Sequence, residues 1–160
     1  MQIFFMDGSE SLRPGLERAL HALRPKTVLH RIRPEELGAG GCSACDVCSW
    51  TTPGICAHSG PAREIARHFA QADLCVLTAD LVSGSPASGI KAVWEHILPV
   101  VHPSFVRYRG ELHHRLRYNR LPALLFIARS RHPADRIEAT IERSIFTSWA
   151  MRAACNTGSR

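Results

Sequence analysis

The sequence lacks any apolar run long enough to cross a membrane, which excludes an ordinary helical membrane protein. A membrane-spanning helix needs about 20 consecutive apolar residues, and the longest runs here have the length of a strand. The first seven residues contain neither the basic region nor the cleavage site of a secretory signal. A Walker phosphate loop and a Gly-x-Ser-x-Gly nucleophile motif are also missing. We therefore expect a cytoplasmic protein without membrane attachment.

Lysine is scarce, because arginine supplies 18 of the 20 basic residues, and the formal net charge is +6. A basic chain is a candidate for nucleic-acid binding. The positive charge is concentrated in residues 107–120, however, and no nucleic-acid-binding module is recognisable around it. An anionic small ligand or a solvated surface therefore explains the charge better than a nucleic acid does.

Strand-like and helix-like segments alternate along the chain. Apolar runs of strand length occupy residues 2–6, 27–33, 73–79 and 121–128, and the last of these is expected to be buried. Residues at helical spacing follow each run, and these helices are predicted at residues 12–23, 61–69, 90–98 and from 134 onward. The alternation implies an α/β fold with a parallel sheet. We predict four or five strands in this sheet, in the order 2-1-3-4 with or without a fifth.

The pattern predicts a single domain over residues 1–160, with two interruptions. A cysteine-rich insert spans residues 41–57, and an excursion rich in arginine and histidine spans residues 99–121. The excursion has no clear period, so we interpret it as a lid or an interface. Ser59 is the predicted N-cap of the helix that Pro61 begins.

The strand at residues 73–79 is predicted to lie at the centre of the sheet. A loop of small residues, 80–89, follows it and leads into the helix from Ile90. The first strand ends in a similar turn at residues 7–11. Ligands of open parallel sheets bind at the carboxyl ends of the strands, where backbone N–H groups and hydroxyls meet an anion. These two loops are therefore the predicted ligand site.

Four of the six cysteines lie between residues 42 and 56, with the spacing Cys-x2-Cys-x2-Cys-x7-Cys. They are the candidate metal ligands Cys42, Cys45, Cys48 and Cys56. Thiolates this close together suit a [4Fe–4S] cluster or a zinc ion, and free redox-active thiols are a third interpretation. Cys75, on the central strand, is predicted to be a small buried hydrophobic residue.

Four stretches of the sequence match motifs of one known family. Asp7-Gly8-Ser9 resembles its phosphate loop, residues 41–56 its compact cysteine segment, residues 84–91 its flavin-ring loop, and residues 110–118 a Gly-Glu-x-His-His-x-x-Arg-Tyr stretch. The family is that of the flavodoxin-like NAD(P)H-dependent FMN reductases, and the cysteines resemble its branch of iron–sulfur flavoproteins. The resemblance implies a flavodoxin-like three-layer sandwich.

The resemblance also implies an FMN site with three parts. The parts are a phosphate loop (Gly8, Ser9, Ser11 and Arg13), a ring loop (Val82, Ser83, Gly84, Ser85, Pro86 and Ser88) and a third wall (Ala128, Arg129 and Ser130). Glu10 adds a negative charge beside the expected phosphate. We therefore expect weaker retention of FMN than is usual in the family.

The implied activity is that of an FMN-binding oxidoreductase or electron-transfer flavoprotein that uses NAD(P)H or a reduced carrier, with a [4Fe–4S] cluster as a second implied centre. Redox chemistry would come from the flavin, so no protein acid or base is predicted. We expect a homodimer or homotetramer. Two roles are open for His113, His114, Arg115, Arg117 and Tyr118: to form part of the partner's flavin pocket, or to clamp an anionic nucleotide. The alternative is a non-flavin iron–sulfur or zinc-binding accessory protein on the same fold.

Overall fold

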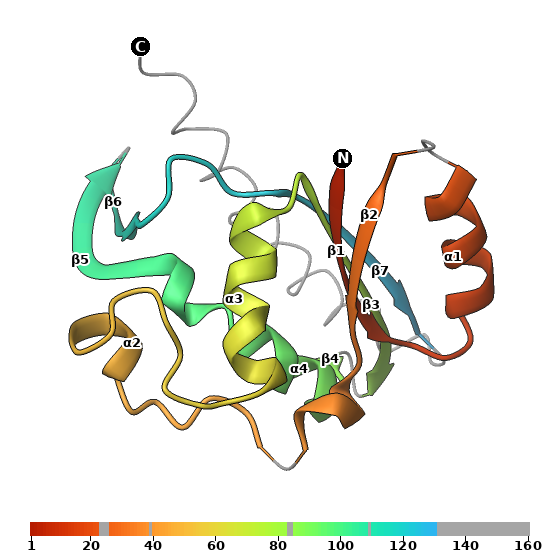
Figure 1. Ribbon diagram of the computed structural model, residues 1–160, viewed down its shortest axis with the longest axis horizontal. Helices are drawn as coiled ribbons and strands as arrows, with labels where there is room; N and C mark the ends of the chain where they lie inside the picture. Colours follow the sequence, from red (N-terminus) through yellow and green to blue (C-terminus); the bar gives the residue numbers. More distant parts are fainter. Residues whose placement is uncertain (23–25, 39, 83–84, 109, 131–160) are drawn as a thin grey trace.

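The computed structural model describes residues 1–22, 26–38, 40–82, 85–108 and 110–130. The helix predicted from residue 134 and Cys155 lie outside these ranges. At the centre are four parallel strands, β1 (Gln2–Gly8), β2 (Val28–Ile32), β3 (Leu74–Val82) and β7 (Ala123–Arg129). Their order is β2-β1-β3-β7 (Figure 1). The predicted order 2-1-3-4 is confirmed, with β7 as the fourth parallel strand and β3 inside the sheet.

Helices cover both faces of this sheet. Helix α1 (Arg13–Ala22) lies on one side, and α3 (Pro61–Gln71) and α4 (Ser88–Glu95) lie on the other (Figure 1). Alternate side chains of β1 face opposite layers, because successive residues of a strand point to opposite faces. Ile3 and Phe5 pack with Leu20 of α1, whereas Phe4 and Met6 pack against α3 and α4. The result is the flavodoxin-like three-layer arrangement.

The loop predicted at residues 80–89 is partly strand, which corrects the sequence interpretation. Strand β3 continues to Val82 and turns back to pair, antiparallel, with β4 (Ser85–Pro86). Leu81 is buried in this extension, so apolar burial carries the strand beyond residue 79. Helix α4 then ends at Glu95, and a short 3-10 turn, η2 (Leu98–Val100), follows it.

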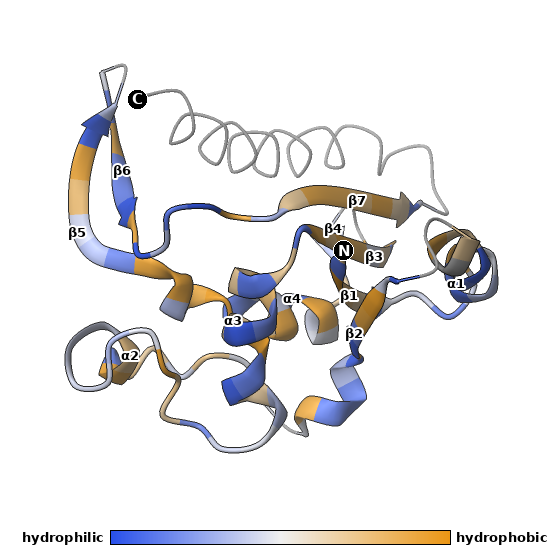
Figure 2. Cartoon of the chain, turned by 45° about the horizontal axis from the view of Figure 1, so that its top comes forward, coloured by the Kyte–Doolittle hydropathy of each residue, from blue (hydrophilic) through white to orange (hydrophobic). Residues whose placement is uncertain are grey.

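The excursion at residues 99–121 contains an antiparallel hairpin that the sequence did not indicate. It consists of β5 (Val101–Tyr108) and β6 (Glu111–Leu116), with an irregular register between Val101 and Phe105. Most residues of both strands are exposed or half-buried, and Figure 2 shows hydrophilic and hydrophobic residues mixed along them. A hairpin without a fully buried face has no reason to show the period-2 pattern by which strands are recognised.

Two further expectations are wrong in detail. The N-cap of α3 is Gly60, not Ser59, and its φ of 72° is a conformation that glycine adopts readily. Strand β7 was expected to be buried, but its residues are exposed or half-buried.

Between β2 and α3 the chain forms a 3-10 turn, η1 (Pro34–Leu37), and the short helix α2 (Val47–Trp50). In the part of the chain that the structure describes, no helix is long and apolar enough to cross a membrane.

Candidate functional site

The carboxyl end of β1 lies tightly against β3 and α4. The Gly8 N–H donates to Thr78 Oγ1 at 3.2 Å. A Cβ atom at Gly8 would lie 2.5 Å from the Thr78 carbonyl oxygen and 2.8 Å from Ile90 Cγ1. Only glycine allows this approach, which brings the first predicted loop against the strand and the helix that bear the second.

Asp80 links the two predicted loops. The Ser9 hydroxyl donates to Asp80 Oδ1 at 3.1 Å, and the hydroxyls of Ser9 and Ser11 are 3.1 Å apart. Arg129, at the end of β7, donates from Nε to the same Asp80 oxygen at 2.8 Å. The structure therefore brings predicted residues from the ends of β1 and β7 together at a carboxylate of β3. Asp80 itself was not predicted as a site residue, although a carboxylate directly after the central strand was a usable signal.

A second buried carboxylate, Asp7, organises the start of α1. Its side chain is fully buried, and Oδ2 accepts from Arg13 Nε at 2.5 Å and lies 3.7 Å from Arg31 Nε. Asp7 Oδ1 has no hydrogen-bond partner among the described residues. The hydrogen bond with Asp7 raises the pKa of Arg13, and the nearby carboxylates of Glu10 and Glu17 also raise it. Arg13 is therefore bound to a carboxylate at the place where a phosphate was expected.

The predicted ring loop is described in part, because Ser83 and Gly84 lie outside the described residues. Val82 is 63% exposed, and Ser88 is the exposed first residue of α4. Ser85 and Pro86 form β4. Of the third wall, Ala128 and Ser130 are exposed on either side of Arg129.

The two halves of the predicted FMN site differ in their fit to the cofactor. Exposed Val82 and Ser88 offer an apolar surface and a hydroxyl group, which suit a flavin ring. The groups predicted for the phosphate are instead bonded to carboxylates, Arg13 to Asp7 and Ser9 to Asp80. The described residues therefore fit the ring and do not fit the phosphate.

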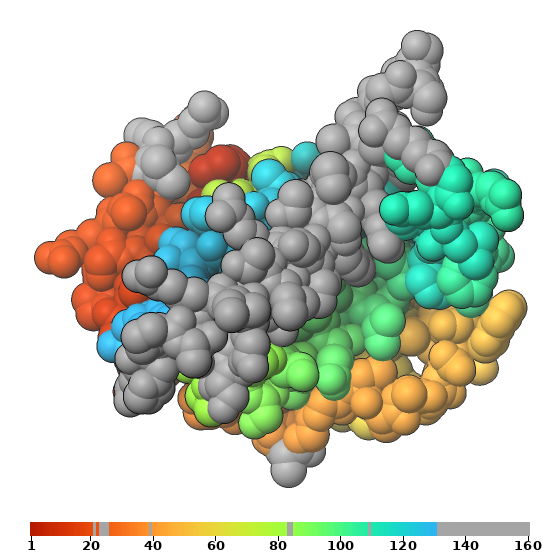
Figure 3. Space-filling model, turned by 180° about the vertical axis from the view of Figure 1, so that it is seen from behind, coloured from red at the N-terminus to blue at the C-terminus, as the bar shows by residue number. Residues whose placement is uncertain are grey.

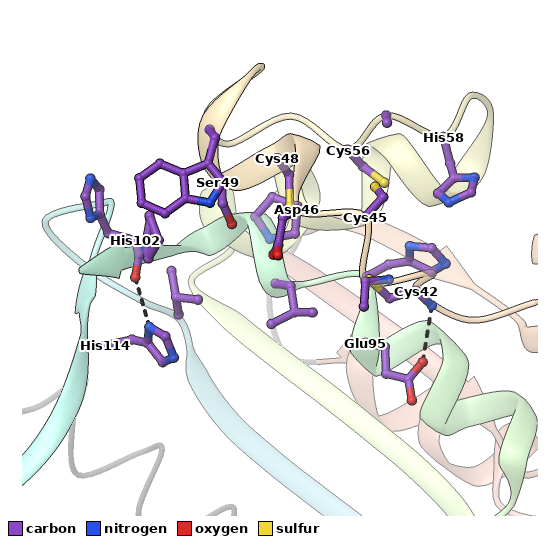
Figure 4. Close-up of a pocket in the computed structure, with 18 residues that line it drawn as sticks. Cys42, Cys45, Asp46, Cys48, Ser49, Cys56, His58, Glu95, His102 and His114 are labelled. Atoms are coloured by element: carbon purple, nitrogen blue, oxygen red, sulfur yellow. Dashed lines mark hydrogen bonds between the residues drawn. The ribbon is translucent and has the colours of Figure 1, made fainter. Parts of the chain in front are cut away.

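A cavity of about 340 Å³ lies at the other end of α4, and all four clustered cysteines line it (Figure 4). Glu95 and His96, from the C-terminal end of α4, also line it, as do His102 and His114 of the hairpin. The hairpin and the insert are neighbours at one end of the molecule (Figure 3). His114 Nδ1 is 3.0 Å from the His102 carbonyl oxygen, and a Cβ at Gly54 would lie 3.3 Å from the Tyr118 hydroxyl. The stretch 110–118 thus packs on the insert of its own chain.

The cysteine loop has an unusual backbone and a fixed anchor. Cys45 lies between Ala44 and Asp46, whose φ angles of 52° and 56° are left-handed and uncommon outside glycine. The Cys42 N–H donates to Glu95 Oε2 at 3.2 Å, as the dashed line in Figure 4 marks. The loop is therefore held to α4 in a conformation that such residues adopt most often at binding sites.

The four thiols share one environment. Burial raises the pKa of Cys48, and the neighbouring thiols of Cys42, Cys56 and Cys45 raise it further. All four are free thiols in this structure. Their number and softness fit an iron–sulfur cluster. However, no three histidine, cysteine or carboxylate side chains of the described residues are placed to hold one metal ion. The four thiols are therefore suitable ligands by type, but the described side chains are not close enough together to bind one metal ion.

His96 lines the same cavity, and the sequence analysis did not single it out. It is 3% exposed, and its Nδ1 has no partner within the described part of the chain. Burial lowers the pKa of His96, against a hydrogen bond with Gly40 that raises it. A histidine at the end of a predicted helix carries no sequence signal that separates it from a surface residue.

No protein-family model matches the sequence, and no curated protein matches it. Several solved structures, however, resemble the fold of this chain. An azoreductase from Bacillus anthracis superimposes with a TM-score of 0.66 at 8% identity, over 94% of this chain and 81% of that one. An FMN-dependent NADH-azoreductase from the same organism, solved in complex with FMN, gives 0.61 at 14% identity over 94% and 82%. At these identities the likeness shows a common fold, so the chain has the flavodoxin-like fold of these enzymes.

Proposed function

We propose that this chain is a flavin-dependent oxidoreductase that takes electrons from NAD(P)H or a reduced carrier. The observation that supports this most is the likeness over 94% of the chain to an NADH-azoreductase that binds FMN. The meeting of the β1 and β3 loops at Asp80 adds to it, because ligands of such sheets bind at this edge. When bound, the flavin would supply the hydride and electron chemistry.

The protein's own part is to position the flavin. In this proposal the ring lies over the exposed end of β3 and the start of α4, where Val82 offers apolar contact and Ser88 a hydroxyl group. The remaining proposed ring residues are Ser83, Gly84, Ser85 and Pro86, of which the first two lie outside the described part. Asp80 acts as a positioning residue, since it joins Ser9 and Arg129 beneath this surface.

The test is a titration of the purified protein with flavin, followed by the quenching of flavin fluorescence, and then by NAD(P)H oxidation. Saturable binding at one flavin per chain is expected. A matched pair of variants locates the site: Ser88→Trp, at the exposed start of α4, should abolish binding, whereas Ser104→Trp, at an exposed position of the distant hairpin, should not. If the wild-type protein shows no saturable binding, the proposal is wrong and only the fold remains.

A [4Fe–4S] cluster at Cys42, Cys45, Cys48 and Cys56 is a second, separate part of the proposal. Its support is that four thiols line one cavity and that the backbone on both sides of Cys45 is left-handed. Anaerobically purified protein should contain iron and lose it in Cys48→Ala, while Cys75→Ala, in the core, should keep it. Zinc in place of iron would favour the accessory-protein alternative, and protein without either metal would contradict the metal site.

We also propose that the protein is a cytoplasmic homodimer or homotetramer. Several apolar side chains of the hairpin are exposed, and Phe105, Val106 and Leu112 are 57%, 44% and 66% accessible. Exposed apolar groups gathered on one element are typical of association surfaces. Light scattering after size-exclusion chromatography should give a multiple of the monomer mass, and Leu112→Glu should shift it toward the monomer. A monomeric wild-type protein would contradict this proposal.

A further inference from the structure

The loop predicted to hold the flavin phosphate is locally negative, although the chain as a whole is basic. The charged residues around it form two groups of ion pairs. Arg13 and Arg31 share Asp7, and Arg31 also pairs with Glu17, whereas Arg129 pairs separately with Asp80. Glu10 acts on Arg13 as an additional negative neighbour. These are four carboxylates against three guanidinium groups, so the formal charge of the group is −1. A phosphate monoester, which carries about −1.5 to −2 at pH 7, would meet net repulsion here.

Arg13 cannot bind a phosphate without breaking its ion pair with the buried Asp7. Asp7 is 1% exposed, and its Oδ1 already has no partner among the described residues. If Arg13 turned away, the nearest cation to Asp7 would be Arg31, at 3.7 Å. An unpaired buried carboxylate is strongly unfavourable, so this ion pair holds Arg13 in place.

The hydroxyl group of Ser9 is likewise bonded to a carboxylate of the protein. Ser9 is 1% exposed, and its hydroxyl donates its only proton to Asp80. Arg129 donates to the same oxygen of Asp80. Releasing either donor would again leave a carboxylate less well paired. Arg13 and Ser9 of the predicted phosphate loop are therefore held by carboxylates of the protein itself, as is Arg129 of the third wall, and the Ser11 hydroxyl lies 3.1 Å from that of Ser9.

From this network we infer that the site recognises a flavin by its ring and sugar-alcohol chain and gains nothing from the 5′-phosphate. The flavin that it takes is therefore riboflavin as readily as FMN. This inference rests on the proposed flavin function and names the ligand class of the same site. It also supplies a structural reason for the weak FMN retention expected from Glu10.

The decisive experiment compares riboflavin and FMN, which differ only in the phosphate, in fluorescence-quenching titrations of the same wild-type protein. We expect dissociation constants within about threefold of each other, or riboflavin tighter. FMN binding that is tighter than riboflavin binding by more than about threefold overturns the inference and leaves the proposed function intact. If neither flavin binds, both the inference and the proposed function fail.

Charge variants test the cause. Glu10→Gln, at an exposed position, should tighten FMN by about twofold to fivefold and leave riboflavin unchanged. Asp80→Asn should also favour FMN over riboflavin, because it removes the negative charge that pairs with Arg129. The matched control Glu111→Gln, on the distant hairpin, should change neither constant. If neither Glu10→Gln nor Asp80→Asn moves the ratio of the two constants, the carboxylates are not the reason and the inference is overturned.

Discussion

Replacing Gly8 by alanine tests whether close packing of β1 against α4 builds the site. The added Cβ would lie 2.5 Å from the Thr78 carbonyl oxygen, 2.8 Å from Ile90 Cγ1 and 2.9 Å from Ile90 Cβ. None of these atoms is the tip of a flexible side chain: one is backbone of the central strand, and Ile90 is 2% exposed. Relief requires both β3 and α4 to move away from β1, and overpacking of this kind costs about 2 kcal/mol.

Gly15 provides the matched control. It lies within α1, and a Cβ there would meet no atom within 4 Å. Alanine should therefore stabilise the helix by about 0.5–1 kcal/mol. A third variant, Gly41→Ala, would meet mainly the carboxylate end of Glu95, which can rotate away only by giving up its hydrogen bond from the Cys42 N–H, so its cost should be about 1 kcal/mol. The predicted order of stability is Gly15→Ala, wild type, Gly41→Ala and Gly8→Ala.

Urea unfolding followed by circular dichroism measures this order. The midpoint should fall in Gly8→Ala with an unchanged slope, because the change affects the native state and not the surface exposed on unfolding. The same variant should weaken flavin binding, since the two loops no longer meet correctly. A Gly8→Ala protein as stable as the wild type, with Gly15→Ala behaving as expected, would refute the claim that this contact is tight.

Two further outcomes follow from the cysteines and histidines. Iodoacetamide labelling, mapped by mass spectrometry, should modify the exposed Cys45 first and the buried Cys75 only on unfolding. Cys48 should react slowly, because its raised pKa leaves little thiolate. Rapid labelling of Cys75 would contradict its burial. Burial and nearby His30 lower the pKa of His68, so the unfolded chain binds the proton more readily and stability should fall as the pH drops below about 6.5. His68→Phe keeps the ring contacts with Phe4 and His30 and should make the melting temperature less dependent on pH between 7.5 and 5; an unchanged dependence would contradict this.

The sheet was predictable because its strands are apolar and short. Residues 2–6 lie in β1 and residues 74–79 in β3, and the buried side chains of these strands leave a plain signal in the sequence. The hairpin β5–β6 left no such signal, since its faces are largely exposed and its register is irregular. Burial of one face imposes the alternation of apolar and polar residues on a strand. A strand with few buried side chains lacks this alternation and is recognised only from its hydrogen-bonded partner strand.

The candidate site shows the same division. The resemblance pointed to Gly8, Ser9 and Arg13, and the structure does gather them at one edge of the sheet. The resemblance did not reveal that Asp7 accepts a hydrogen bond from Arg13 and Asp80 one from Ser9. Such pairs depend on which side of the sheet each side chain faces. Ser9 and Asp80, for example, are 71 positions apart in the sequence and are brought together only by the parallel pairing of β1 with β3.

The apolar runs, the helical spacing and the short gaps between cysteines predict an α/β fold with four cysteines in one insert, because each of these signals acts over a few residues. The three-layer arrangement was expected from the family resemblance, and the observed pairing of β2, β1, β3 and β7 confirms the predicted strand order. The partners of the charges at the strand ends, and the histidines and carboxylates that line the cysteine cavity, became known only from the three-dimensional structure. The reason is that electrostatic and hydrogen-bonding partners are chosen by distance in space, and strand pairing brings together residues that no local pattern connects.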